Sequence, residues 1–322
     1  MKATAIAHTN IALIKYWGKR DEKLILPANS SLSITLDKFY TETTVEWLED
    51  AKNDSFSLNG QVKQDAKVAQ FLNVLRAEFD VPYFAKIDSV NHVPTAAGLA
   101  SSASAFAALA VASSAALGRK DDMANLSRLA RRGSGSATRS LFGGLAIWQK
   151  GTRSDGRDSF AVPFHSNLTE KIAVVVAVVS DEEKAISSRD GMKSTVLTSP
   201  FFGEWIQTAE EDLRNIKNAF LSENFVEVGE ILEHNAMKMH ATTLGAKPPF
   251  TYFSSVSISV MEEVRKLRAE GIPAYFTMDA GPNVKVICLR ENENLVAERM
   301  RKFVKDAHVC HAGEGAKVIR VD

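Results

Sequence analysis

The sequence has few cysteines, no excess of either charge and no long apolar run. Its 322 residues include only Cys288 and Cys310, too few for a disulfide framework, so a reducing compartment is expected. Lysine and arginine total 39, as do aspartate and glutamate, and this balance gives no overall attraction to nucleic acid or to an anionic membrane. Neither a signal-peptide pattern nor an apolar stretch of bilayer length occurs. We therefore expect a cytoplasmic protein without a nucleic-acid or membrane partner.

Several common binding and catalytic motifs are also missing. No GxxxxGK[ST] sequence occurs, which disfavours the P-loop NTPases, and the lack of GxSxG argues against an ordinary serine hydrolase. The segment 133–135, Gly-Ser-Gly, lacks the third glycine and the preceding strand of a dinucleotide fingerprint. His308, Cys310 and His311 lie close together without a second cluster at zinc-ligand spacing, so we predict solvated surface there and no metal site.

The hydrophobic pattern mixes strands and helices. Strands are predicted at 4–7, 32–36, 43–47, 84–88, 171–180, 274–278 and 284–289. Helices are predicted at 65–79, 101–117, 205–221, 225–239 and 252–270. The apolar run within 171–180 is typical of a strand covered on both faces and should open the second half, while 151–158 reads as a hairpin or loop. The length and the 45% hydrophobic content then indicate an α+β protein of about two domains.

One segment has the features of a phosphate site. Residues 94–104, with the sequence PTAAGLASSAS, lead from a predicted strand into a helix of small residues. Free backbone N–H groups and the positive end of the dipole at a helix start can hold phosphate, and small side chains permit close approach. A serine-capped helix without a ligand explains the same pattern equally well.

That segment resembles the central ATP-phosphate motif of the GHMP kinases. Three further segments resemble one branch of that superfamily, the mevalonate diphosphate decarboxylases: NIALIKYWGKRD at 10–21, RRGSGSATR at 131–139 and FTMDAGPNV at 276–284. With SSRDGM at 187–192, they follow the family order along nearly the whole chain. The resemblance implies a GHMP-kinase fold: an N-terminal ATP-binding domain, 1–180, with a mixed sheet and packed helices, and a C-terminal α/β sandwich domain, 181–322, for substrate binding and dimer contacts.

The resemblance also implies a reaction. ATP phosphorylates the 3-hydroxyl of mevalonate 5-diphosphate, and loss of phosphate and carbon dioxide then gives isopentenyl diphosphate, a step of isoprenoid biosynthesis. ATP and Mg²⁺ are the expected cofactors, and a homodimer is the expected assembly. Since no compact protein cage for Mg²⁺ is visible in the sequence, we expect the ion to bind through nucleotide phosphates and water.

A catalytic set follows from the resemblance. Asp279 accepts or orients the proton of the 3-hydroxyl, Arg139 meets the substrate carboxylate, and Asn10 holds the guanidinium in place. The other expected members, near the ATP phosphates and the developing charges, are Lys15, Lys184 and Ser102. Taken alone, Asp279 is better explained as a turn cap before Gly-Pro, and each cation as a solvated surface charge.

Further positions are carried over in the same way. The implied substrate-binding residues are Tyr16, Trp17, Gly18, Lys19, Lys67, Ser134, Gly135, Ser136, Ala137, Thr138, Ser188, Arg189 and Met192. The implied nucleotide-binding residues are Ser89, Asn91, Pro94, Ala96, Ala97, Gly98, Leu99, Ala100, Ser101 and Ser102. Lys67 stands where several relatives have arginine, and lysine keeps the charge but loses the forked donor. Hydrophobic core explains the region around Ser89 and Asn91 equally well.

Two alternatives remain open at this stage. The chain could be another GHMP enzyme, either a kinase that stops after phosphorylation or a decarboxylase of the monophosphate. It could also be a catalytically inactive binding protein on the same scaffold, although the retained polar groups argue against that. Those groups are Asn10, Ser102, Arg139, Lys184, Arg189 and Asp279.

Overall fold

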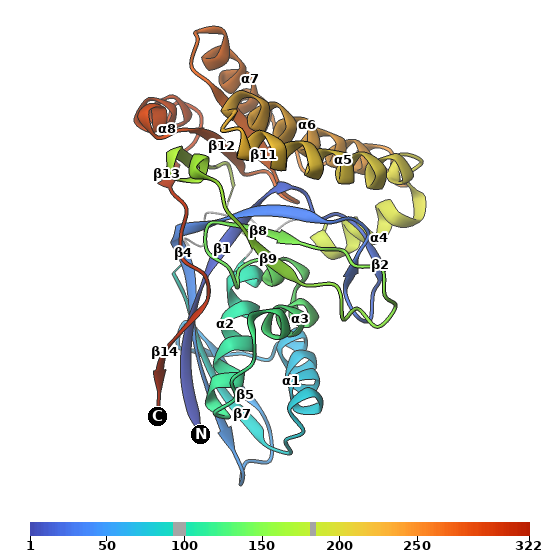
Figure 1. The fold of residues 1–322 in the computed structure, drawn as a ribbon, viewed down its shortest axis with the longest axis vertical. Coiled ribbons are helices and arrows are strands. Elements are labelled where there is room, and N and C mark those ends of the chain that lie inside the picture. The colour runs from blue at the N-terminus through green and yellow to red at the C-terminus, as the bar shows by residue number, and fades with distance from the viewer. Residues whose placement is uncertain (93–100, 181–184) are drawn as a thin grey trace.

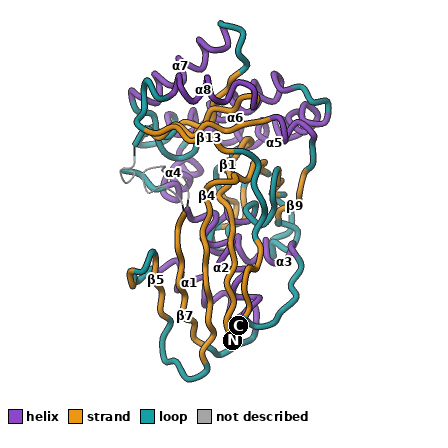
Figure 2. The backbone as a smooth tube through the Cα atoms, turned by 90° about the vertical axis from the view of Figure 1, so that its left-hand side faces the viewer, coloured by secondary structure: helices purple, strands orange, loops and turns teal. Residues whose placement is uncertain are grey.

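The computed structural model describes residues 1–92, 101–180 and 185–322. Two regions are stacked along the long axis of the molecule, each built from a sheet and the helices packed on it (Figure 1). The chain ends lie side by side at the far end of the first region (Figures 1 and 2). The predicted α+β class is confirmed.

The first sheet has long, mostly antiparallel strands in the order β14-β1-β4-β7-β5-β6, with β8 joined to β4 and β9 to β8. Its strands are β1 (Lys2–Ile14), β4 (Ser31–Leu48), β5 (Ser55–Leu58), β6 (Gln61–Val62), β7 (Phe84–His92), β8 (Leu145–Trp148), β9 (Ala161–Phe164) and β14 (Lys317–Val321). A separate two-stranded ribbon joins β2 (Lys19–Asp21) to β3 (Leu26–Pro27). Strands β8 and β9 pair across the segment 151–158, which confirms the predicted hairpin loop.

Strand β4 is longer than the sequence pattern predicts. The segments 32–36 and 43–47 belong to one strand and not to two. Asn10 of β1 pairs with Thr35 of β4, whereas His8 pairs with Tyr40, so the residues between form a bulge in β4. The polar residues within this bulge break the alternation, which is why the pattern suggested two strands.

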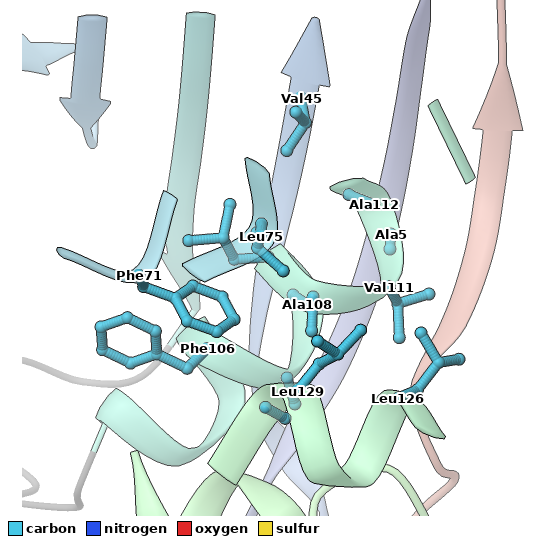
Figure 3. Packing of buried hydrophobic residues seen from close by; sticks show 14 of the residues in the cluster. Ala5, Val45, Phe71, Leu75, Phe106, Ala108, Val111, Ala112, Leu126 and Leu129 are labelled. Carbon is cyan, nitrogen blue, oxygen red and sulfur yellow. The ribbon is translucent and has the colours of Figure 1, made fainter. Parts of the chain in front are cut away.

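Helices cover one face of the first sheet. They are α1 (Ala66–Phe79), α2 (Ser101–Ala116), α3 (Met123–Gly133) and the 3-10 helix η2 (Gly135–Thr138). Asp65 caps α1 by accepting hydrogen bonds from the amides of Lys67 and Val68. The small residues of α2 let it lie against the strands, where Phe71, Phe106 and Ala108 belong to one buried cluster (Figure 3). This packing fixes the start of α2 relative to the end of β1.

The second sheet has the order β11-β12-β10-β13. Its strands are β10 (Ile172–Val178), β11 (Ala274–Met278), β12 (Val284–Leu289) and β13 (Asp306–Cys310). Its helices are α4 (Ser188–Thr198), α5 (Phe202–Leu221), α6 (Phe225–Leu244), α7 (Ser255–Ala269) and α8 (Glu293–Met300), with the 3-10 helices η3 (Asn167–Lys171) and η4 (Arg290–Asn292). Every residue of β10 is buried, as predicted, because Val174 packs toward α5 and α6 and Val175 toward α7 and α8.

Sheet membership changes twice along the chain. Strand β10 pairs with β12 and β13, so the second sheet begins before residue 180, and β14 returns to the first sheet. A buried cluster that includes Ile11, Val174 and Leu213 joins the two regions. The division at residue 180 stays a prediction.

The prediction of solvated surface at His308, Cys310 and His311 is wrong for Cys310. This thiol is buried in β13, and both cysteines are free. The His311 ring lies between two carboxylates, 3.4 Å from Asp37 and 2.8 Å from Glu293, and so ties the first sheet to α8. In the described ranges, no group of three or more metal-binding side chains occurs.

None of the helices in the described ranges is both long and apolar enough to cross a membrane.

Candidate active site

A cleft between the two regions brings most of the predicted site residues together. Its walls come from the end of β1, the start of α2, the segment around η2, helices α4 and α6, and the turn after β11. The predicted residues that line it are Asn10, Lys15, Tyr16, Trp17, Lys19, Lys67, Ser102, Ser134, Gly135, Ser136, Arg139, Ser188, Arg189, Met192 and Asp279. These positions are far apart in the sequence, so their convergence supports one common site.

Other predicted residues lie outside the cleft lining. Gly18 has a φ of +93°, and a Cβ there would lie 2.3 Å from the Phe202 ring, so the turn requires glycine. Ala137 and Thr138 are buried within η2, where the Thr138 hydroxyl donates to the carbonyl of Gly135 at 2.6 Å. Both residues shape the wall of the cleft from behind.

The predicted nucleotide-binding residues are placed only in part. Ser89 and Asn91 lie on β7, where their side chains bond Thr43 and Thr41 of β4, and they are not among the cleft-lining residues of the described chain. Their predicted contact with adenine stays a prediction. The positions outside the described residues are Pro94, Ala96, Ala97, Gly98, Leu99, Ala100 and Lys184, and Ser101 is placed only as the first residue of α2.

The backbone of Lys15 is braced from both sides. Its N–H donates to Oδ1 of Asn235 on α6 at 2.8 Å, and its carbonyl accepts from Nδ2 of Asn29 at 2.7 Å. Asn235 in turn donates to Asp212 at 2.7 Å, and Lys238 pairs with that carboxylate at 2.7 Å. Because these groups are buried or nearly so, the network holds Lys15 at the junction of the two regions.

Asp279 lies between two buried lysines. Lys15 Nζ is 2.7 Å from Oδ1 and also donates to the carbonyl of Ala12, while Lys285 Nζ is 3.3 Å from Oδ2. Burial lowers the pKa of Lys15 to about 8, although Asp279 opposes the shift. Burial alone would raise the pKa of Asp279, but the two ammonium groups outweigh it and hold that pKa well below its usual range. The carboxylate is therefore ionised at neutral pH and is a weak base.

Arg139 is a buried cation held by neutral groups. Its Nε and Nη2 lie 3.3 Å from Oδ1 of Asn10, and its Nη1 donates to the hydroxyl of Ser31 at 2.5 Å. Asn10 is itself fixed through Nδ2, which donates to Ser140 Oγ at 2.8 Å and to the carbonyl of Ser136. Burial lowers the pKa of Arg139 to about 10, so it stays charged at neutral pH. Among the described residues it forms no ion pair, and such a cation favours a bound anion.

Hydroxyl groups line the floor of the cleft. The Ser134 hydroxyl lies 3.3 Å from those of Ser102 and Ser136, which connects the start of α2 to η2. The buried Tyr16 hydroxyl has no hydrogen-bond partner among the described residues. A Cβ at Gly135 would lie 2.7 Å from the Tyr16 ring, so only glycine permits this approach. These hydroxyl groups can donate hydrogen bonds to a polar ligand or accept hydrogen bonds from it.

The outer end of the cleft is rich in positive charge. Lys19, Lys67 and Arg189 line the cleft and also an adjoining hollow, where Lys23 and Arg132 add two more cations. Glu22 is the carboxylate of that hollow, 2.6 Å from Lys19 Nζ. In a chain with no net charge, this concentration suits a ligand that carries several negative charges.

Comparison with known proteins agrees with this geometry. The family described as "Diphosphomevalonate decarboxylase-like N-terminal domain" matches residues 7–161, and "Mevalonate 5-diphosphate decarboxylase C-terminal domain" matches residues 174–320. The chain belongs to the diphosphomevalonate decarboxylase family. The resemblance carried by the sequence motifs is thereby confirmed.

Curated members of the family are similar over most of their length. The diphosphomevalonate decarboxylase of Candida albicans is 38% identical over 317 residues, which cover 93% of this chain and 88% of the relative. That of Ganoderma lucidum is 39% identical over 332 residues, which cover 95% of this chain and 83% of the relative.

Solved structures of the family share the fold. A structure of the enzyme from Enterococcus faecalis is 48% identical, with a TM-score of 0.94 and coverage of 100% and 99%. The Staphylococcus aureus enzyme is 43% identical, with a TM-score of 0.95 and coverage of 99% and 98%. A structure described as "MDDEF in complex with MVAPP, AMPPCP and Magnesium" is 49% identical, with a TM-score of 0.96 and coverage of 100% and 99%. These matches confirm the expected two-domain GHMP-kinase fold.

Sequence reasoning missed several residues that line this cleft or support its side chains. Lys285 carried a usable signal, since it is a lysine within the apolar strand β12. Ser31 and Asn235 had no local signal, because their partners Arg139 and Lys15 lie far away in the sequence. The cleft-lining residues Ile25, Phe106, Gly133, Met239 and Ala280 were also missed.

Proposed function

We propose that this chain decarboxylates mevalonate 5-diphosphate with ATP, forming isopentenyl diphosphate, ADP, phosphate and carbon dioxide. The observation that carries the proposal is the placement of Arg139 and Asp279 in one cleft. Arg139 offers a buried planar cation for the substrate carboxylate, and Asp279 offers an ionised acceptor for the 3-hydroxyl. A kinase that stops after phosphorylation has no need to manage the carboxylate during bond cleavage.

The first step is phosphoryl transfer to the 3-hydroxyl. Asp279 accepts a hydrogen bond from that hydroxyl and orients its oxygen toward the γ-phosphorus of ATP, with ADP as the leaving group. Lys15, 2.7 Å from Asp279, fixes the carboxylate and adds positive charge beside the reacting oxygen. Since Asp279 is a weak base, orientation contributes more than prior removal of the proton.

The second step breaks two bonds. The 3-phosphate departs with the electron pair of its carbon–oxygen bond, and the electron pair of the bond to the carboxylate forms the new alkene as carbon dioxide leaves. Arg139 holds the carboxylate in the required geometry, and Asn10 and Ser31 keep the guanidinium in place.

The described residues of the cleft suit an ATP molecule whose phosphates carry the Mg²⁺ ion. Asp279 is already bound by two lysines, so the described part of the cleft has no spare carboxylate for an all-protein metal cage. The ion therefore suits a site on the ATP phosphates, where it neutralises charge during transfer. Ser102, at the start of α2, lines the cleft, and a helix start favours a bound anion, which supports a contact between Ser102 and those phosphates.

The diphosphate tail explains the outer cations. Lys19, Lys67 and Arg189 lie along the outer part of the cleft and in the adjoining hollow, beyond Arg139 and Asp279. A second phosphate extends the ligand toward these side chains. Their number favours the diphosphate over the monophosphate as substrate.

We also propose a cytoplasmic homodimer with an ATP-binding domain at 1–180 and a substrate and dimer domain at 181–322. Leu197, Phe201 and Leu244 are apolar and more than half exposed, and Phe201 packs beside Gly245 at the end of α6. Exposed apolar side chains of this kind suit a contact between two copies. Sedimentation equilibrium measures the assembly state.

The test of the function is product analysis. The purified protein is incubated with ATP, Mg²⁺ and either mevalonate 5-phosphate or mevalonate 5-diphosphate, and ADP, phosphate, carbon dioxide and the organic product are measured. Equal amounts of ADP, phosphate and carbon dioxide from the diphosphate support the proposal. Formation of a phosphorylated acid and ADP alone indicates a kinase, and faster turnover of the monophosphate corrects the substrate.

A further inference from the structure

Lys285 is a buried cation with no place in the mechanism above. It is the second residue of β12, a strand whose other residues are aliphatic or cysteine, and its side chain is 3% exposed. Its ammonium donates to the carbonyl of Asn283 at 3.1 Å and lies 3.3 Å from Oδ2 of Asp279. Burying an ammonium group in a strand is costly unless it is paired, so its position needs an explanation.

The two oxygens of Asp279 are held separately. Lys15, which follows β1 in the first region, contacts Oδ1, and Lys285, from the second region, contacts Oδ2. A carboxylate gripped at both oxygens from opposite sides cannot rotate freely. Each oxygen has two lone pairs, so a substrate hydroxyl can still bind without displacing either lysine. The Asp279 side chain is 37% exposed, which leaves it open to the cleft.

Lys285 acts behind the carboxylate. Within the described chain, the residues that line the cleft include Asp279 and Lys15 but not Lys285. Any effect of Lys285 on the substrate therefore passes through Asp279.

We propose that Lys285 is a positioning residue for the reaction, which fixes both the orientation and the negative charge of Asp279. This inference rests on the proposed function, since it assigns a role within that reaction. Asp279 serves as an oriented anion that accepts the hydroxyl hydrogen bond, and the proton passes along that bond to the carboxylate as the bond from oxygen to phosphorus forms.

The charges around Asp279 determine what removal of Lys285 does. Among the described residues, the charged or titratable groups that act on this carboxylate are Lys15, Lys285, Arg139 and His240. Burial lowers the pKa of His240 to about 3, so its ring is neutral near pH 7. Without Lys285, burial is opposed by less positive charge and the pKa of Asp279 rises. Activity that requires the anion then falls at a higher pH than in the wild type.

The experiment compares Lys285→Met, which keeps length but removes the charge, with Lys285→Arg, which keeps the charge. Lys266→Met, at an exposed lysine of α7, is the control. We expect kcat of Lys285→Met to fall by about 100-fold, with KM for both substrates changed by less than about threefold, because a misplaced catalytic group loses rate before binding. The acidic limb of the kcat–pH profile of Lys285→Met should move up by about one pH unit or more. Lys285→Arg should restore part of kcat, and the acidic limb of its kcat–pH profile should lie at the wild-type pH.

A second measurement does not depend on turnover. The ¹³C resonance of the Asp279 carboxyl, assigned by its loss in Asp279→Asn, is followed against pH in the wild type and in Lys285→Met. The titration should move to higher pH in the variant. If Lys285→Met does not fold, Lys285→Gln, which keeps a hydrogen-bond donor, carries the same measurements.

The inference is overturned by unchanged kcat and an unchanged carboxyl titration in the folded neutral variant. It is also overturned if the variant raises KM for the substrate as much as it lowers kcat, because Lys285 would then contact the ligand directly. Failure of the wild type to act on mevalonate 5-diphosphate contradicts the proposed function instead, and the carboxyl titration still decides the role of Lys285.

Discussion

Positively charged side chains differ between two parts of the cleft. The floor holds Lys15, Arg139 and Asp279 beside the serine hydroxyls, and the outer end holds Lys19, Lys67 and Arg189. On the floor, Lys15 and Arg139 are each 2% exposed, and hydrogen bonds from several elements fix them. At the outer end, Lys67 is exposed and Arg189 lies at the start of α4, open to the adjoining hollow. Lys19 is the exception there, since its side chain is 5% exposed and pairs with Glu22. Fixed buried cations act on charge that develops during reaction, whereas exposed ones mainly attract and hold a charged ligand. The difference separates residues expected to govern kcat from residues expected to govern KM.

The largest effect is expected at Asp279 on the floor. Asp279→Asn keeps the shape of the side chain but removes the charge that orients the hydroxyl. We expect turnover to fall by at least about 1,000-fold, with ATP and substrate affinity changed by only a small factor. Steady-state kinetics and calorimetric binding measure the two separately. Turnover close to wild type would leave Asp279 as a turn residue.

Arg139 tests whether geometry or charge matters on the floor. Arg139→Lys keeps a positive charge but loses the planar pair of donors, and kcat should fall by about 100-fold while ATP binds normally. In Asn10→Ala, kcat should fall by about 10-fold, since Asn10 acts only by holding the guanidinium of Arg139.

A double-mutant cycle sharpens this test. If Asn10 and Arg139 form one unit, the double variant should lose less free energy than the sum of the single losses. Strictly additive losses would contradict the unit. Little loss in Arg139→Lys would transfer carboxylate binding to another cation, with Lys15 the first candidate.

The outer cations should show the opposite pattern. Arg189→Ala should raise KM for mevalonate 5-diphosphate by about 10-fold and leave kcat within about threefold, because it removes a charge-assisted contact made equally before and during reaction. The effect should weaken at high salt, since exposed charges are screened. Arg157→Ala, an exposed arginine outside this cleft and its adjoining hollow, is the control. A fall in kcat alone at Arg189 would break the contrast between floor and outer end.

The smallest effect distinguishes two serines of α2. Ser102→Ala, at the cleft, should lower kcat by about fivefold through the loss of one hydrogen bond to the ATP phosphates. Ser113→Ala should be nearly silent, because its buried hydroxyl has no partner among the described residues. Equal losses at both positions would assign the serines to packing.

Much of the fold follows from local sequence features. Asp65 begins α1 as a side-chain cap, and the apolar runs at 274–278 and 284–289 match β11 and β12 residue for residue. Strand β14 was not predicted, because its residues are exposed and its identity depends on pairing with β1. Short helices such as α8 were missed because their apolar stripe covers only two turns.

The candidate site divides in the same way. The motif residues Asn10, Arg139 and Asp279 could be named from the sequence, since their order along the chain resembles the family. Ser31, which holds Arg139, could not be, because a hydrogen bond between distant segments leaves no spacing to read. Lys285 had the signal of a lysine within an apolar run, but its partner Asp279 could be identified only from the structure. The side chains that hold a catalytic residue in place are therefore identified from how distant segments pack together, and not from the sequence motif.

The pairing of β14 with β1 has a consequence for the order of folding. Val321 lies opposite Ala3, and the amide of Asp322 donates to the carbonyl of Lys2 at 2.9 Å, so the first strand is completed by the last. Closing so long a loop is entropically slow, and during synthesis β14 is made after β1 and the elements between them. One edge of β1 therefore stays open while the rest of the chain is made. Until β14 pairs with it, that edge presents unpaired backbone N–H and C=O groups to which another strand can bond.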